Sequence, residues 1–348
     1  MAVAAPRASC IAALIAALLR VQAVSADPAG AKEIIFTEYS PLATSPEIAR
    51  RMLSPLVGLQ LEQRAARAGK KMIEQPINLP AEHFIVYVPA IRPPRGFAVL
   101  VFIPPWSDAR LPPGWSPALE RDGVIFVSAG RSGNAESVFD RRVPLALLAA
   151  HNIVSQFLVD PDAVYIAGFS GGGRVAIRLA LAYPDVFSGA ILNAGSDPIG
   201  DPQIPLPPKE LFYRFQQATH LVYVTGADDV ERLPLDQASM HSMRQWCVFG
   251  IQDHIERSTA HDVVASTAFA WALGAVLRDS TREPTRLAKC RATVERELHA
   301  QLNAAEDLVA RGERETATEL LTKIDGRYGG MAAPRSVELE KALQASTP

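Results

Sequence analysis

Short apolar runs recur along the middle of the chain and predict the strands of a β-sheet. Residues 97–103 (FAVLVFI) are apolar throughout, which is typical of a strand buried on both faces. Comparable runs, rich in β-branched and aromatic side chains, occupy 83–88, 124–128, 163–167, 189–194 and 221–225, with a weaker one at 247–255.

Segments with helical periodicity separate these runs. Apolar residues spaced three and four positions apart predict helices at 143–158, 174–183, 235–246 and 263–277. Strands that alternate with helices favour an α/β fold with a mostly parallel sheet and helices on both faces. In such a sheet the chemistry is expected at the carboxyl ends of the strands.

The two ends of the chain follow a different pattern. Residues 27–80 are mixed in character and contain one helix-like stretch at 45–67. Residues 284–348 are helical throughout, with breaks at Gly312 and at the glycine pair 329–330. Their apolar spacing resembles a single tetratricopeptide-type hairpin, and one such unit cannot bury its own apolar face. We therefore expect a helical hairpin docked on the sheet domain.

The first 26 residues have the features of a secretory signal peptide. A basic residue precedes an apolar run at 11–19, and Val24-Ser25-Ala26 offers a cleavage site of small residues. We therefore expect a periplasmic or secreted protein. Cleavage leaves Cys247 and Cys290 as the remaining cysteines, and an oxidising compartment favours a disulfide between them. Because Cys247 opens the last predicted strand, this bond would tie the helical tail to the sheet. The alternative is two buried free thiols.

Composition and charge argue against several classes of protein. The chain of 348 residues is 48% apolar and 21% charged, as expected for a globular protein with a substantial core. Its 35 basic and 37 acidic residues are nearly balanced, which argues against a nucleic-acid partner. No apolar run is long enough to predict a membrane span. The sequence contains no metal-binding or phosphate-loop motif, so no cofactor is implied.

One motif points to a chemical reaction. Residues 168–172 read Gly-Phe-Ser-Gly-Gly and fit G-x-S-x-G, between the apolar run at 163–167 and a helical stretch. This is the setting of a nucleophile elbow. Small neighbours allow Ser170 to occupy a strained turn, and Gly171 presents its N–H at the helix start toward a developing oxyanion. The alternative is a glycine-rich turn that binds an anion or no ligand.

The residues around this motif resemble a known fold family. Residues 159–174 (VDPDAVYIAGFSGGGR), 181–187 (LAYPDVF) and Asn193-Ala194-Gly195 are similar to the α/β-hydrolase fold. Within that fold they resemble the secreted esterases grouped with polyhydroxybutyrate depolymerases and feruloyl esterases. The resemblance covers about residues 83–278.

This resemblance suggests a division of the chain into four parts. We expect a signal peptide at 1–26, an N-terminal extension at 27–80, an α/β-hydrolase catalytic domain at 81–280 and a helical C-terminal extension at 281–348.

The resemblance also implies the order of the catalytic residues along the chain, in which the acid follows the nucleophile Ser170 and the histidine comes last. Asp229 occupies the acid position, while Asp228 is a close competitor and Asp197 a distant third. His261 lies between the last predicted strand and the final helix of the sheet domain, where the base belongs. In the alternative interpretation, the candidate aspartate is a loop residue that caps a helix, and His261 is a surface histidine that caps a helix.

Two backbone N–H groups are expected to bind the oxyanion. Gly171 supplies one, and the resemblance places the second on the loop after 97–103. That loop reads Pro-Pro-Trp-Ser-Asp, and because proline has no N–H, the candidate is the backbone of Trp106. The loop at 131–134 follows a neighbouring strand and is either a substrate contact or a polar surface loop.

These residues predict a serine hydrolase that cleaves carboxylic esters through an acyl-enzyme on Ser170. The substrate would be a small or polymeric ester. The sequence does not define its acyl and alcohol groups, because the shape of the pocket determines which groups are accepted. Two alternatives also stay open. One is a peptidase with the same triad, and the other is a secreted binding protein that keeps the elbow without catalysis.

Overall fold

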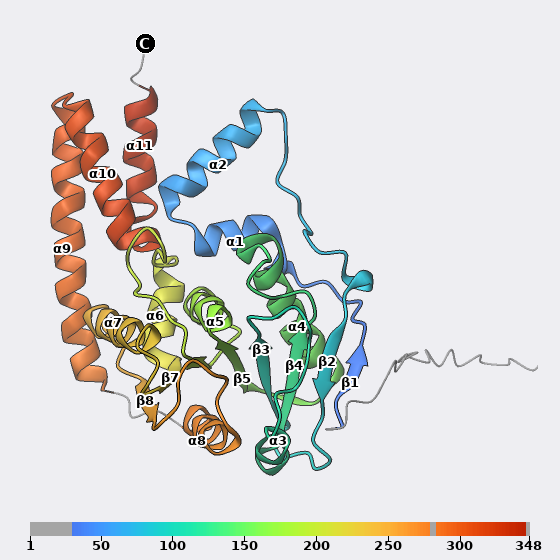
Figure 1. Cartoon of the computed structure of the whole chain (residues 1–348). Coiled ribbons are helices and arrows are strands. Elements are labelled where there is room, and N and C mark those ends of the chain that lie inside the picture. The colour runs from blue at the N-terminus through green and yellow to red at the C-terminus, as the bar shows by residue number, and fades with distance from the viewer. Residues whose placement is uncertain (1–29, 279–282, 346–348) are drawn as a thin grey trace, which may run out of the picture.

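A single mixed sheet organises the computed structural model, which describes residues 30–278 and 283–345 (Figure 1). Its eight strands are β1 (Lys32–Ile34), β2 (Phe84–Tyr87), β3 (Phe97–Ile103), β4 (Val124–Ala129), β5 (Val159–Phe169), β6 (Gly189–Asn193), β7 (His220–Gly226) and β8 (Ile251–Glu256). They lie in the order β1-β2-β4-β3-β5-β6-β7-β8. Only the pairs that include β1 or β2 are antiparallel. This is the strand order of the α/β-hydrolase fold, so the predicted fold class is confirmed.

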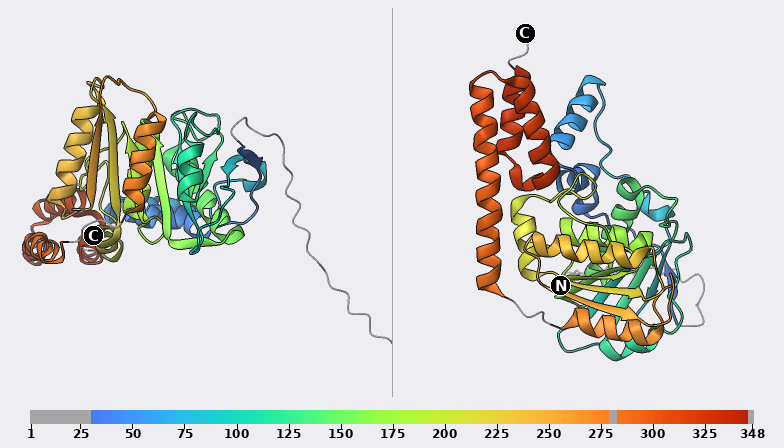
Figure 2. Two further views of the ribbon diagram at one scale, coloured as in Figure 1. Left: turned by 90° about the horizontal axis from the view of Figure 1, so that it is seen from below. Right: turned by 60° about the vertical axis from the view of Figure 1, so that its left-hand side comes forward.

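Helices cover both faces of this sheet (Figures 1 and 2). One face carries α3 (Ser116–Asp122) and α8 (Ser266–Leu277). The other carries α4 (Val143–Gln156), α5 (Gly171–Ala182), α6 (Lys209–Ala218) and α7 (Arg232–Gln245). Side chains of a strand alternate between the two faces. In β3, Val99 and Val101 pack on the α4 side and Leu100 and Phe102 on the α3 side. The continuous apolar run of β3 therefore reflects burial on both faces.

The N-terminal region contributes a strand and two helices, α1 (Ser45–Met52) and α2 (Pro55–Arg67). The single helix predicted at 45–67 is therefore wrong. Pro55 disfavours helical geometry at the residue before it, and Ser54 is extended, with φ −68° and ψ 151°. Asp325 from the C-terminal region stabilises the new helix start, because its carboxylate accepts hydrogen bonds from Ser54 Oγ (2.5 Å) and from the backbone N–H of Leu56 (3.0 Å).

The C-terminal region forms three helices, one more than the predicted hairpin. They are α9 (Pro284–Ala310), α10 (Arg314–Tyr328) and α11 (Arg335–Ala345). Of these, α10 and α11 lie beside α2 (Figure 1), and the apolar faces of all three helices join the core on the α5 side of the sheet. Figure 2 shows the same helices from two other directions. Arg291 of α9 anchors the helix to α6, since its guanidinium donates to the carbonyl oxygen of Tyr213 at 2.6 Å.

A disulfide joins Cys247 to Cys290, with the two Cα atoms 5.7 Å apart, and thus links α9 to the sheet domain. The prediction that Cys247 opens the last strand is wrong, because β8 begins at Ile251. Cys247 instead ends α7 in a left-handed conformation with φ 64°. The N–H groups of Cys247 and Val248 bond back to the carbonyl oxygens of Arg244 and Met243, which is a helix-terminating Schellman motif.

The predicted leader, residues 1–26, lies outside the described residues. Among the helices that the structure does describe, none combines the length and the apolar character that crossing a bilayer requires.

Candidate active site

Ser170 lies on a tight turn between β5 and α5, with φ 54° and ψ −122°. An L-residue rarely adopts such a conformation, so the turn is strained. Its glycine neighbours are required by close backbone contacts. A Cβ on Gly168 would lie 2.3 Å from the carbonyl carbon of Gly172, and a Cβ on Gly172 would lie 1.9 Å from the carbonyl oxygen of Ile103. The G-x-S-x-G pattern thus allows α5 to pack closely against the sheet.

The structure brings Ser170, His261 and Asp229 into one hydrogen-bonded chain. Ser170 Oγ lies 2.9 Å from His261 Nε2, and His261 Nδ1 lies 2.6 Å from Asp229 Oδ2. The Asp229 side chain is 3% exposed, whereas that of His261 is 39% exposed. The imidazole can therefore meet a ligand while its carboxylate partner is shielded from water.

The loops after β7 and β8 hold this chain of side chains at the carboxyl edge of the sheet. The N–H of Asp228 donates to the carbonyl oxygen of Thr259, 3.0 Å away, and so joins the two loops. The N–H of Val264 donates to Asn193 Oδ1 at 3.0 Å, which ties the segment after His261 to the end of β6. The Phe169 ring lies 4.9 Å from the imidazole ring. Each partner of Ser170 is therefore fixed by contacts from more than one strand.

The structure gives the three candidate acids different surroundings. Asp229 is the one that contacts His261. Asp228 is exposed, although it is adjacent in sequence. Asp197 forms ion pairs with Arg174 and Arg178 of α5, at 2.8 and 2.9 Å.

The segments that carry the two candidate oxyanion donors both contact the 131–134 loop. Gly171 is the first residue of α5, and its Cα is covered by Asn134, because an added Cβ would lie 2.1 Å from Asn134 Oδ1. The N–H of Asn134 donates to Pro105 O at 2.9 Å, so the 131–134 loop packs on the loop that holds Trp106. The Trp106 ring lies 6.2 Å from that of Phe169 and forms apolar surface near the site.

Two features of the site region have no signal in the sequence. A cavity of about 450 Å³ opens beside Ser170 and is lined by four arginines from three elements of the chain. Behind the site lies Asp236, a buried carboxyl group on α7 that accepts hydrogen bonds from Ser196 Oγ (2.5 Å) and Thr225 Oγ1 (2.6 Å). Burial raises the pKa of Asp236 to about 6, although these hydrogen bonds act in the opposite direction.

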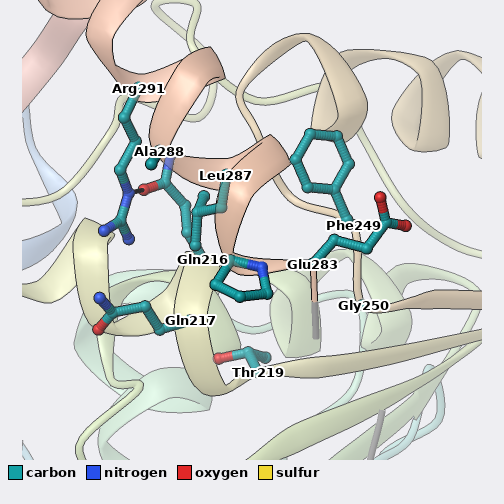
Figure 3. A pocket seen from close by; sticks show the side chains of 10 residues that line it. Gln216, Gln217, Thr219, Phe249, Gly250, Glu283, Leu287, Ala288 and Arg291 are labelled. Atoms are coloured by element: carbon teal, nitrogen blue, oxygen red, sulfur yellow. Dashed lines mark hydrogen bonds between the residues drawn. The ribbon is translucent and has the colours of Figure 1, made fainter. Parts of the chain in front are cut away.

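Another cavity, of about 270 Å³, lies between α6 and α9 (Figure 3). Its wall includes Gln216, Thr219, Phe249 and Arg291. Thr219 lies one residue before the amino end of β7, and Phe249 lies two residues before the amino end of β8. The cavity therefore lies at the opposite end of these strands from the loops that carry Asp229 and His261.

The strand order and the serine elbow at the carboxyl edge define an α/β-hydrolase fold. Two curated proteins are similar to short parts of the chain. "Putative esterase NocK" of Nocardia uniformis subsp. tsuyamanensis is 40% identical over 72 residues, which are 21% of this chain and 19% of the relative. Poly(3-hydroxybutyrate) depolymerase of Ralstonia pickettii is 46% identical over 44 residues, 13% of this chain and 9% of that protein. The matches thus span less than a fifth of either relative. They confirm the resemblance to esterases and polyhydroxybutyrate depolymerases that was inferred from the motif residues.

Solved structures are similar over a larger part of the chain but at lower identity. S-formylglutathione hydrolase FrmB of Staphylococcus aureus has a TM-score of 0.44 and 14% identity, covering 57% of this chain and 93% of that one. The poly(3-hydroxybutyrate) depolymerase LpqC of Bordetella parapertussis has a TM-score of 0.41 and 16% identity, with coverages of 60% and 88%. No protein-family model matches the chain.

Proposed function

We propose that the protein is a serine esterase that cleaves carboxylic esters through an acyl-enzyme on Ser170. The observation that supports this most strongly is the continuous chain from Ser170 Oγ through His261 to the buried carboxylate of Asp229. A serine hydroxyl is a weak nucleophile unless a neighbouring base accepts its proton. The similarity to an esterase and a depolymerase supports an ester rather than another acyl compound as the substrate.

In the proposed reaction, Ser170 Oγ attacks the carbonyl carbon of the ester while His261 Nε2 takes the hydroxyl proton. Asp229 Oδ2 accepts the hydrogen bond from Nδ1–H, which keeps the correct tautomer and stabilises the imidazolium. The negative charge on the carbonyl oxygen is stabilised by the backbone N–H groups of Gly171 and Trp106. His261 then protonates the departing alcohol. A water molecule, deprotonated by His261, hydrolyses the acyl-enzyme and restores Ser170.

The proposal includes export of the protein. Residues 1–26 resemble a signal peptide, and a disulfide between Cys247 and Cys290 is compatible with an oxidising compartment. Mass spectrometry tests whether the leader is removed. The measured mass is that of the protein recovered from cells that express the full chain. Cleavage after Ala26 is expected, and an intact N-terminus in the cytoplasm would contradict export.

A substrate panel tests the proposed activity. We expect hydrolysis of 4-nitrophenyl esters of short acyl chains and much slower hydrolysis of peptide 4-nitroanilides. Ser170→Ala should lower kcat by about 10⁴-fold or more. Ser155→Ala, at an exposed position near the end of α4, is the matched control and should keep wild-type turnover. Anilide hydrolysis above ester hydrolysis would support a peptidase, and no turnover of any substrate would support a binding protein.

A further inference from the structure

The cavity beside Ser170 has a strongly basic wall. Arg142 contributes from the turn that precedes α4, Arg174 and Arg178 from α5, and Arg232 from the first turn of α7. Among the described residues, no acidic side chain lines this cavity. The cavity volume of about 450 Å³ lies within the range of small-molecule sites.

Only part of this positive charge is balanced by ion pairs. Asp197 lies behind the wall and pairs with Arg174 and Arg178, and Asp201 acts on Arg178 at longer range. These contacts hold the two arginines of α5 in place. Among the described residues, Arg142 and Arg232 form no such ion pair.

Arg142 is 4% exposed, and in the described part of the chain it forms no ion pair with a carboxylate. Its hydrogen bonds go to the carbonyl oxygens of Ser132 (2.8 Å) and Pro104 (3.1 Å). Burial, together with the nearby positive charge of Arg178, lowers the pKa of Arg142 to about 10, so the group is still charged at neutral pH. A buried cation without a counter-ion is costly. An anion in the cavity would reduce this cost.

Arg232 is half-buried, and its Nε is buried without a hydrogen-bond acceptor among the described residues. The buried carboxyl of Asp236 acts on it only at a distance, since that group bonds to Ser196 and Thr225. The guanidinium therefore has donor capacity that the protein does not use, on the same cavity wall as Ser170.

We propose that this cavity binds a free carboxylate that the ester substrate carries near its scissile bond. This inference rests on the proposed esterase function, because it requires a substrate at Ser170. Guanidinium groups recognise carboxylates through paired, charge-assisted hydrogen bonds. Linear oligomers of hydroxy acids and half-esters of dicarboxylic acids are the ester types that have such a group. The structural alternative is an arginine network that only braces the loops.

The test uses two pairs of esters that differ in one charge. 4-Nitrophenyl hemiglutarate has a carboxylate on its acyl part, and 4-nitrophenyl pentanoate is the neutral counterpart. The linear dimer of 3-hydroxybutyrate has a carboxylate on its alcohol part, and its primary amide is the neutral counterpart. For at least one pair, we expect the wild-type kcat/KM to be about tenfold or more higher for the anionic member.

Variants then assign this preference to the arginines. Arg232→Gln and Arg174→Gln should each lower the anionic-to-neutral ratio of kcat/KM by about tenfold, mainly through KM for the anionic ester. Arg244→Gln removes an exposed arginine of the same helix α7, outside the cavity wall, and should keep the wild-type ratio.

The outcomes separate this inference from the proposed function. If the wild-type protein hydrolyses neutral esters as well as their anionic counterparts in both pairs, the carboxylate site is refuted while the esterase function remains. A preference that persists in both arginine variants refutes it as well, and thermal unfolding checks that these variants are folded. If none of the four esters is hydrolysed, the esterase function itself is refuted.

Discussion

Replacing Asp229 with asparagine should remove most of the activity without unfolding the site. Asp229 Oδ1 accepts a hydrogen bond from the backbone N–H of Arg232 at 3.1 Å, while Oδ2 lies 2.6 Å from His261 Nδ1. In Asp229→Asn, the amide oxygen accepts the hydrogen bond from the backbone N–H of Arg232, so the amide nitrogen faces His261. Nδ1 must then act as the acceptor, and the ring proton moves to Nε2, which faces Ser170 Oγ. In this tautomer the imidazole cannot take the serine proton.

The expected loss follows from the burial of this contact. The Asp229 side chain is 3% exposed, so water cannot replace the lost carboxylate. We expect kcat to fall by about 10³- to 10⁴-fold, which corresponds to roughly 4 to 5.5 kcal/mol in the activation free energy. Asp228→Asn, one residue away and exposed, is the matched control and should change kcat less than about threefold.

The assay is the initial rate on an activated ester, with circular dichroism as a check of folding. A larger loss in Asp228→Asn than in Asp229→Asn would refute this assignment of the acid. A loss below about tenfold in Asp229→Asn would refute the role of the tautomer.

Two further predictions concern stability and its dependence on pH. Loss of the Cys247–Cys290 disulfide, which spans 43 residues, should lower the free energy of unfolding by up to about 4 kcal/mol. Urea unfolding of Cys290→Ser measures this loss, and an unchanged unfolding midpoint would contradict the prediction. The raised pKa of Asp236, about 6, means that the folded protein keeps a proton that the unfolded chain releases near pH 4. This group should therefore contribute a fall in stability of about 3 kcal/mol as the pH rises from about 4 to 6, and this contribution should be missing from the pH dependence of Asp236→Asn.

The sheet could be predicted from the sequence because parallel strands buried on both faces are continuous apolar runs. β3, β4 and β7 are buried along their whole length, and each matches such a run. β1 has three residues and only partial burial, so it has no comparable signal. The break between α1 and α2 does have a local signal, Pro55, which the apolar periodicity of the 45–67 stretch obscures.

The elbow could be found because its requirements are local. The close contacts of Gly168 and Gly172 demand glycine within two residues of Ser170. The choice between Asp228 and Asp229 depends instead on which neighbouring side chain the turn after β7 directs inward. Spacing along the chain does not encode that direction, so the sequence left both open.

The arginine-lined cavity could not be predicted for a different reason. Arg142, Arg174, Arg178 and Arg232 are separated by up to 90 residues and meet only because three elements converge beside Ser170. Each arginine by itself has the appearance of an ordinary surface charge. Their common function depends on ion pairs and burial, which belong to the folded state.

Labelling with a fluorophosphonate probe tests the central claim, that Ser170 is an activated nucleophile, most directly. The probe reacts with a serine hydroxyl that a neighbouring base has activated. We predict one adduct per folded molecule, located on Ser170 by peptide mass spectrometry and absent from Ser170→Ala. Folded wild-type protein that remains unlabelled, or an adduct that persists in Ser170→Ala, would contradict the claim.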